Sequence, residues 1–160
     1  MLTIVYTLCL WGAAIGCGLI AGVYFAFSAF VMRALSALPP ESGAAAMQSI
    51  NEVILRSAFM PLFVGTTLAA LALVGIGIFR WGTPGAPEAV LGGATYVTGM
   101  VIVTLAFNVP LNSLLAGAAG GPEAAKVWSR YLSDWTFWNH VRTGASLAAC
   151  LLFTLSIRAD

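Results

Sequence analysis

Long uncharged stretches separated by short polar connections dominate this sequence. A helix needs about 20 apolar residues to cross the roughly 30 Å of hydrocarbon in a bilayer. The last stretch, residues 143–157, reaches that length only if its helix begins near Trp138. The first stretch is too long for a cleaved signal peptide, so we expect it to stay in the protein as a membrane helix. The pattern predicts one membrane domain over residues 1–160 with four spans: 2–32, 57–79, 89–111 and 138–157.

Two of the connections carry amphipathic patterns. Residues 33–56 contain the helix-start sequence PPE, followed by apolar residues at helical spacing. Residues 122–137 place aromatic residues at helical spacing, and such residues also favour the membrane interface. We therefore predict an all-α fold, an integral membrane bundle of four transmembrane helices with short interfacial helices in the first and third connections. The helix in the third connection can run straight into the fourth span.

The composition agrees with a lipid environment. Hydrophobic residues make up 60% of the chain and charged residues 8%, whereas soluble domains carry about 25% charged residues. The net charge of +1 gives no electrostatic reason to expect a nucleic-acid partner. The three cysteines fall in apolar stretches without a CxxC pair, so we expect them to pack as small hydrophobic residues. We predict an integral membrane protein of the kind found in a bacterial inner membrane.

Polar side chains gather on one side of the predicted bundle. In four antiparallel spans, the end of the first, the start of the second, the end of the third and the start of the fourth lie on the same side. The polar residues at these ends are Tyr24, Ser28, Asn51, Arg56, Asn108, Asn112, Asn139, His140 and Arg142. Ionisable residues inside a membrane segment are functional candidates by default. The sequence therefore predicts a polar pocket at one mouth of the bundle.

The third span ends in a pair of asparagines. Asn108 and Asn112 are four residues apart, so both amides lie on one helix face. Pro110 between them removes a backbone donor and loosens the helix locally. The two amides could hold a substrate, or they could bond to neighbouring helices as packing contacts.

The start of the fourth span carries the densest polar group. Asn139 and Arg142 are three residues apart, and Trp135 and Trp138 flank the same face. His140 is turned by about 100° from Asn139, so we expect it to border this face. Structural alternatives apply here too, because an arginine at a span end can snorkel to the interface and a histidine can be an ordinary interfacial residue.

Four segments together resemble a known family. They are GLIAGVYFAFSAFVMRAL at 18–35, LPPESGAAAMQSIN at 38–51, NVPLN at 108–112 and WTFWNHVRT at 135–143. In this order they resemble the anthrone oxygenase-like family of small four-span membrane proteins, over nearly the whole chain. The resemblance implies a membrane-embedded oxygenase that uses oxygen to convert an anthrone methylene into an anthraquinone carbonyl. We expect its partners to be membrane lipid and an apolar aromatic or lipid-like small molecule.

Residue roles follow from that implied reaction. Loss of a proton from the activated carbon gives a delocalised oxyanion, which Arg142, with Arg56, could stabilise. His140 is the one side chain with a reference pKa near neutral pH, about 6.5, so we expect His140 and Arg142 to be catalytic. The expected substrate-binding residues are Asn108, Asn112, Asn139, Arg56, Trp135, Trp138 and Tyr24.

Metal and cofactor sites find little support in the sequence. A single histidine without clustered carboxylates cannot form a two-histidine, one-carboxylate iron site within one chain. We predict no metal and no cofactor, with a haem held through His140 as the alternative.

Two non-catalytic functions fit the same pattern. The pocket could bind a lipid or amphipathic ligand without chemistry, or the chain could be a structural partner subunit. Gly12, Gly16, Gly18 and Gly22 let helices approach closely, within the bundle or across a homo-oligomer seam. Cationic residues are slightly more frequent on the pocket side, so the positive-inside rule places that side in the cytoplasm.

Overall fold

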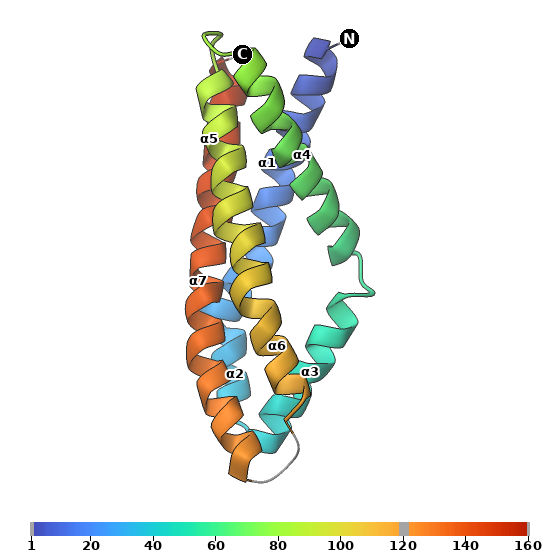
Figure 1. Ribbon diagram of the computed structural model, residues 1–160, viewed down its shortest axis with the longest axis vertical. Helices are drawn as coiled ribbons and strands as arrows, with labels where there is room; N and C mark the ends of the chain where they lie inside the picture. The colour runs from blue at the N-terminus through green and yellow to red at the C-terminus, as the bar shows by residue number, and fades with distance from the viewer. Residues whose placement is uncertain (1, 119–121, 160) are drawn as a thin grey trace.

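The computed structural model describes residues 2–118 and 122–159, and every regular element within those ranges is helical. Several long rods are built from consecutive α-helical and π-helical pieces (Figure 1). The elements in chain order are α1 (Leu2–Ala26), η1 (Phe27–Val31), α2 (Met32–Ser36), α3 (Pro40–Ile54), α4 (Phe59–Phe79), α5 (Ala86–Tyr96), η2 (Val97–Ile102), η3 (Thr104–Asn108), α6 (Val109–Ala116) and α7 (Pro122–Ala159).

Four helices in the described residues are long and apolar enough to cross a membrane. They cover Ile4–Ser36, Phe59–Phe79, Ala86–Ala116 and Glu123–Ala159. The rods pack as one bundle with both chain ends at the same end of the molecule (Figure 1). The chain is therefore an all-α membrane protein with a four-helix bundle, as the sequence predicts.

The rod formed by α7 is the longest element of the bundle. Its 38 residues extend about 57 Å at 1.5 Å per residue, well beyond the roughly 30 Å of hydrocarbon in a bilayer. The aromatic helix expected in the third connection and the fourth span are thus one continuous helix that begins at Pro122. Because α7 packs against α1, α5 and α6, it carries side chains to every level of the bundle.

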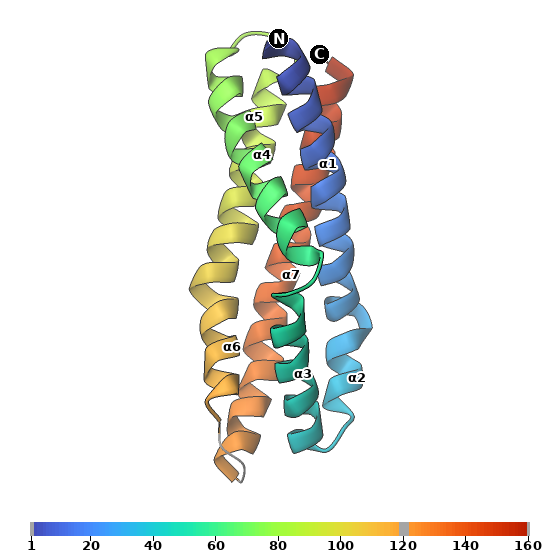
Figure 2. The same cartoon turned by 90° about the vertical axis from the view of Figure 1, so that its right-hand side faces the viewer.

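The second rod is broken near its middle. Its lower part, α3, runs along the bundle beside α2, α6 and α7, and its upper part, α4, continues to the other end (Figure 2). Residues 55–58 between them form a tight turn, which we call the elbow. The Ser57 hydroxyl donates to the Ile54 carbonyl at 2.8 Å and accepts from the Phe59 amide at 3.2 Å. These bonds satisfy backbone groups where α3 ends and α4 begins.

Two π-helical turns lie beside the buried polar residues described below. One is η1, near the end of the first span, and the other is η3, directly before α6. Pro110 accounts for the second turn, because proline has no amide hydrogen and its ring displaces the carbonyl four residues earlier. Such wide turns are frequent at functional sites.

The apolar core has two parts. The upper cluster packs α1 against α4, α5 and α7, and it includes Tyr24 and Phe153. The lower cluster is aromatic and includes Trp128, Tyr131 and Trp135 of α7. The polar residues of interest lie where the two clusters meet.

The glycines of the first span differ in their surroundings. A Cβ atom on Gly16 would collide with the Thr66 side chain of α4, and one on Gly18 would lie 3.6 Å from the Cys150 sulfur. Cβ atoms on Gly12 and Gly22 would meet nothing within 4 Å. Gly16 therefore serves contact inside the bundle, and the expected homo-oligomer seam stays a prediction.

Gly16→Ala should lower the stability of the protein, because Thr66 is buried and cannot easily yield. Forcing an extra methyl group into a packed contact costs about 1–3 kcal/mol. Gly22→Ala is the matched control on the same helix, and we expect it to be neutral or slightly stabilising because alanine favours helix. Thermal unfolding in detergent measures both variants, and equal unfolding temperatures would contradict the Gly16–Thr66 contact.

Candidate functional site

Arg142 is a buried cation in the fourth span. Only 4% of its surface is exposed, although it belongs to a helix that crosses the membrane. Its Nη2 donates to Asn139 Oδ1 at 2.8 Å and its Nη1 to Thr104 Oγ1 at 3.5 Å. The guanidinium carbon lies 4.2 Å from the ring centroid of Tyr24 and 5.0 Å from that of Trp135. Both aromatic rings are within the range of cation–π attraction.

No carboxylate balances this charge in the part of the chain that the structure describes. The ion pairs found there, Glu123–Lys126 and Arg130–Asp134, involve exposed side chains elsewhere on α7. The Nε atom of Arg142 is also buried without a hydrogen-bond partner. A buried charge without an opposite charge is strongly unfavourable, so this guanidinium is well suited to receive an anionic oxygen.

Asn139 forms hydrogen bonds both to the Arg142 guanidinium and to the first span. It is fully buried, and its Nδ2 donates to the Tyr24 carbonyl and to Ser28 Oγ, both at 2.7 Å. Ser28 lies in the π-helical turn η1, and Tyr24 lies three residues before it on α1. Asn139 Oδ1 is then left to accept from Arg142. The orientation of Arg142 therefore depends on Asn139.

A cavity of about 270 Å³ opens beside Arg142. It lies slightly below the 300–1,000 Å³ typical of ligand pockets, so it suits a small ligand. Its walls are mainly apolar and aromatic, and Leu55 of the elbow lines it together with Ile54 and Phe59 on either side. The polar residues that line it are Tyr24, Asn51, Thr104, Asn112 and Arg142.

A second polar network lies at the lower edge of the cavity. The Tyr131 hydroxyl donates to Asn112 Oδ1 at 2.7 Å and accepts from Asn51 Nδ2 at 3.4 Å. Asn51 and Asn112 also line an adjoining groove that contains Gln48 and Glu52. The cavity therefore borders a more polar groove between α3 and α6.

Asn108 lies beside the cavity without lining it. It is buried, and its Nδ2 donates to the Trp135 carbonyl at 3.2 Å. Its Oδ1 and the Trp135 Nε1 are both buried without a partner. Thus Asn108 and Asn112 both face α7, as their spacing predicts, but only Asn112 faces the cavity.

The structure brings together five of the residues expected from the sequence. Tyr24, Asn112, Trp135 and Arg142 line the cavity, and Asn139 bonds to Arg142.

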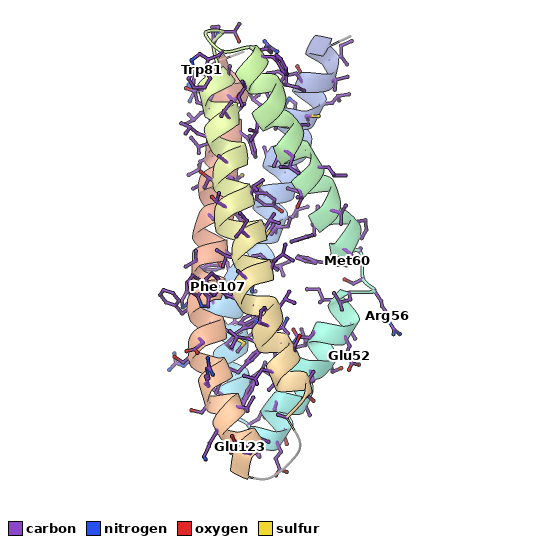
Figure 3. All side chains as sticks on the ribbon, in the orientation of Figure 1. Glu52, Arg56, Met60, Trp81, Phe107 and Glu123 are labelled. Atoms are coloured by element: carbon purple, nitrogen blue, oxygen red, sulfur yellow. The ribbon has the colours of Figure 1, made fainter. Side chains whose placement is uncertain are left out.

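The other expected residues lie elsewhere. His140 is exposed on the outer side of α7. Arg56 is exposed at the elbow, and its side chain extends away from the bundle (Figure 3). Trp138 stacks on Phe107, with ring centroids 3.6 Å apart, beside a different hollow on the outside. Their expected roles stay predictions, and the site beside Arg142 does not contain them.

Thr104 is a cavity residue that the sequence analysis did not single out. It accepts from Arg142 and donates to the Met100 carbonyl at 2.7 Å. Its position four residues before Asn108 was the available signal, because Thr104, Asn108 and Asn112 follow one helix face.

The described side chains offer no cluster of metal ligands. No group of three or more histidine, cysteine, aspartate or glutamate residues that could hold a metal occurs within residues 2–118 and 122–159. His140 does not line the cavity beside Arg142, so a haem bound through it would lie outside this site. The absence of a cofactor is still a prediction.

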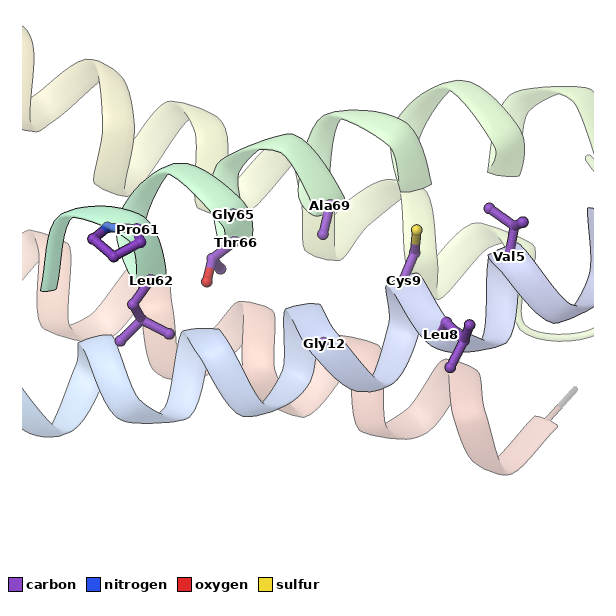
Figure 4. Close-up of a pocket in the computed structure, with 9 residues that line it drawn as sticks. All are labelled: Val5, Leu8, Cys9, Gly12, Pro61, Leu62, Gly65, Thr66 and Ala69. Atoms are coloured by element: carbon purple, nitrogen blue, oxygen red, sulfur yellow. The ribbon is translucent and has the colours of Figure 1, made fainter. Parts of the chain in front are cut away.

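A larger hollow of about 430 Å³ lies between α1 and α4 (Figure 4). Its lining includes Gly12, Gly65 and Ala69, and it contains no charged side chain. Without a charged group it is a weaker candidate for chemistry than the cavity beside Arg142.

A comparison with known protein families identifies a match for this chain. The family model described as Anthrone oxygenase matches residues 51–152, which is more than half of the chain. The matched range includes α4 and the segment with Asn139 and Arg142. None of the curated proteins or solved structures matches the chain.

Proposed function

Because the chain belongs to the anthrone oxygenase family, we propose that it oxidises a small, apolar, anthrone-like substrate in the cavity beside Arg142. The observation that carries this proposal is a buried guanidinium with no carboxylate partner among the described residues, facing an aromatic-walled cavity. Family membership supports a membrane oxygenase in general, and the cavity supports the substrate class.

The charge of Arg142 suits the chemistry of an anthrone. Loss of a proton from the methylene between two aromatic rings gives a carbanion whose charge spreads onto the ketone oxygen. Arg142 would bind that oxyanion in a site poor in water, where stabilisation of developing charge is often the largest contribution to catalysis. Molecular oxygen then reacts at the carbon, and the methylene and O₂ together become a carbonyl and one water molecule.

The walls of the cavity suit a flat ring system. Phe27, Phe59 and Phe63 line it together with Tyr24 and Trp135. Aromatic rings prefer offset-stacked or edge-to-face contacts with one another, so these side chains can hold fused rings.

Two amide groups at the lower edge can position the substrate. Asn51 and Asn112 line the cavity, and an amide both donates and accepts hydrogen bonds. They could therefore bind hydroxyl groups of the substrate at the end opposite the ketone. Neither His140 nor Arg56 has a step in this scheme, because both are exposed outside the cavity.

For localisation, we propose a cytoplasmic membrane with the cavity end facing the cytoplasm. Arg33, Lys126 and Arg130 lie at that end, against Arg80 and Arg158 at the other. This small excess favours the cytoplasm by the positive-inside rule.

The direct test is turnover by the purified protein in detergent or lipid nanodiscs. With an anthrone and air, we expect consumption of one O₂ per anthraquinone formed, measured by an oxygen electrode and by the absorption of the quinone. Binding of the anthrone without oxygen uptake would instead indicate a non-catalytic binding protein.

Val23→Trp should fill part of the cavity and lower kcat/KM by about 5- to 150-fold, because overpacking costs about 1–3 kcal/mol and every 1.4 kcal/mol is about tenfold. Val23 lines the cavity, whereas Leu19, one turn earlier on α1, is 55% exposed. Leu19→Trp adds the same bulk outside the cavity and serves as the control. Equal turnover by the two variants would place the reaction in another part of the molecule.

A further inference from the structure

The cavity contains a cation but no side chain suited to accept a proton. We propose that it takes its ligand as an oxyanion, and that the ligand's proton leaves to water rather than to the protein. The ligand class is then an aromatic acid of the enol or phenol type, and the proton balance is ligand plus water giving bound anion plus hydronium. This inference rests on the proposed function, because it specifies the ionic state of the same ligand.

The lining residues support the second half of the proposal, that the proton does not pass to the protein. Among the described residues that line the cavity there is no aspartate, glutamate, histidine or lysine. Its ionisable groups are the phenol of Tyr24 and the guanidinium of Arg142. Both groups carry their protons at neutral pH, so neither is available as a base.

The elements packed around Arg142 add no acceptor inside the cavity. Within their described ranges, α1, α4, η3 and α6 contain no charged residue. Glu52 on α3 is exposed in the adjoining groove. Asp134 on α7 pairs with Arg130 at 3.1 Å, away from the cavity. Tyr131 is the other phenol near Arg142, and it is bonded to Asn112.

The geometry of Arg142 supports binding of an anionic oxygen. Asn139 Oδ1 accepts a hydrogen bond from Arg142 Nη2, and the buried Nε of Arg142 has no hydrogen-bond partner. Hydrogen bonds from a charged donor to an anionic acceptor are about twice as strong as those between neutral groups. An oxyanion in the cavity would therefore supply the opposite charge that Arg142 lacks among the described residues.

A route for the proton runs along the lower edge of the cavity. Asn51 and Asn112 are shared by the cavity and the groove that holds Gln48 and Glu52. Amide groups of this kind can bind water on the way to the exposed groove. The proton can thus reach bulk water without a permanent acceptor in the site.

The test is an anaerobic titration, because without oxygen the anthrone can bind but cannot be oxidised. Under argon we expect the wild-type protein to raise the ratio of enolate to ketone at fixed pH by about 10- to 1,000-fold, as a nearby opposite charge does for an acid. The absorption spectrum of the enolate reports the ratio. Arg142→Gln should abolish the effect, and Arg33→Gln, at an exposed arginine, should retain it.

Proton release in weakly buffered medium tests the second half of the proposal, that the ligand's proton leaves to water. We expect one proton per bound enolate to appear in solution, detected with a pH indicator, and Glu52→Gln should leave this number unchanged. Bound ketone, enolate without proton release, or no binding at all would each overturn the inference.

Admitting air then separates this inference from the proposed function. Enolate that persists in air would support this inference and contradict the proposed oxygenase function. Turnover in air without any enolate under argon would support the oxygenase function and contradict this inference.

Discussion

Arg142→Gln is expected to reduce anthrone oxidation by about 100- to 1,000-fold, the usual effect of removing one donor to a developing oxyanion. Glutamine can still bond to Asn139, but it carries no charge. The effect should appear in kcat/KM, because Arg142 stabilises the oxyanion that forms once the proton has left.

The same substitution should leave the protein folded. Arg142 is buried, and no described carboxylate pairs with it; replacing an uncompensated charge by a neutral group removes a desolvation penalty. We therefore expect an unfolding temperature equal to or above that of the wild type. Loss of the folded protein would indicate instead that Arg142 serves packing, and unchanged turnover would remove it from catalysis.

Asn139→Asp is expected to inactivate the protein by a different route. A carboxylate at this position would lie where the Asn139 oxygen now accepts from Arg142 at 2.8 Å. It would neutralise the guanidinium and compete with the ligand's oxyanion. Because a nearby opposite charge shifts an ionisation by about 10- to 1,000-fold, we expect a loss of turnover in that range.

Asn139→Leu separates charge from geometry. Both substitutions remove the donor to the Tyr24 carbonyl, which costs about 1–3 kcal/mol when the carbonyl is left unsatisfied. Only the aspartate adds a competing charge. Turnover measured beside the unfolding temperature should therefore show the aspartate variant as the less active of the two, and the reverse order would contradict the role of a free cation.

The helices and part of the site could be predicted from the sequence. Asn139 and Arg142 are three residues apart, and the structure joins them by a hydrogen bond. The amides at 108 and 112 both reach α7, one turn apart, at Trp135 and Tyr131. Helical spacing determines such relations, because it fixes which side chains share a face.

Features that depend on packing could not be predicted in this way. Trp138 lies only three residues from Trp135, yet it contacts Phe107 on the outside of the bundle. The turn of 100° per residue places it at the edge of the face, where the neighbouring helix decides its environment. Arg56 was expected at the start of a span, but the elbow directs it away from the bundle (Figure 3).

The widened turns were also beyond the sequence pattern. Pro110 signals a local disturbance, but it does not determine whether the helix kinks, ends or forms a π turn. The π turn η1 has no proline at all. The Tyr24 carbonyl, three residues before η1, accepts from Asn139, and in this way a side chain of α7 fixes the position of Arg142.

The elbow at residues 55–58 has a consequence for how the site is supplied. Its Leu55 is 65% exposed and also lines the cavity, at the level where α4 enters the apolar part of the bundle. We therefore expect the proposed ligand, dissolved among acyl chains, to enter the cavity from the side without first passing through the aqueous phase. The occupancy of the cavity then follows the mole fraction of ligand among the lipids. A larger membrane area with the same amount of ligand therefore lowers this occupancy.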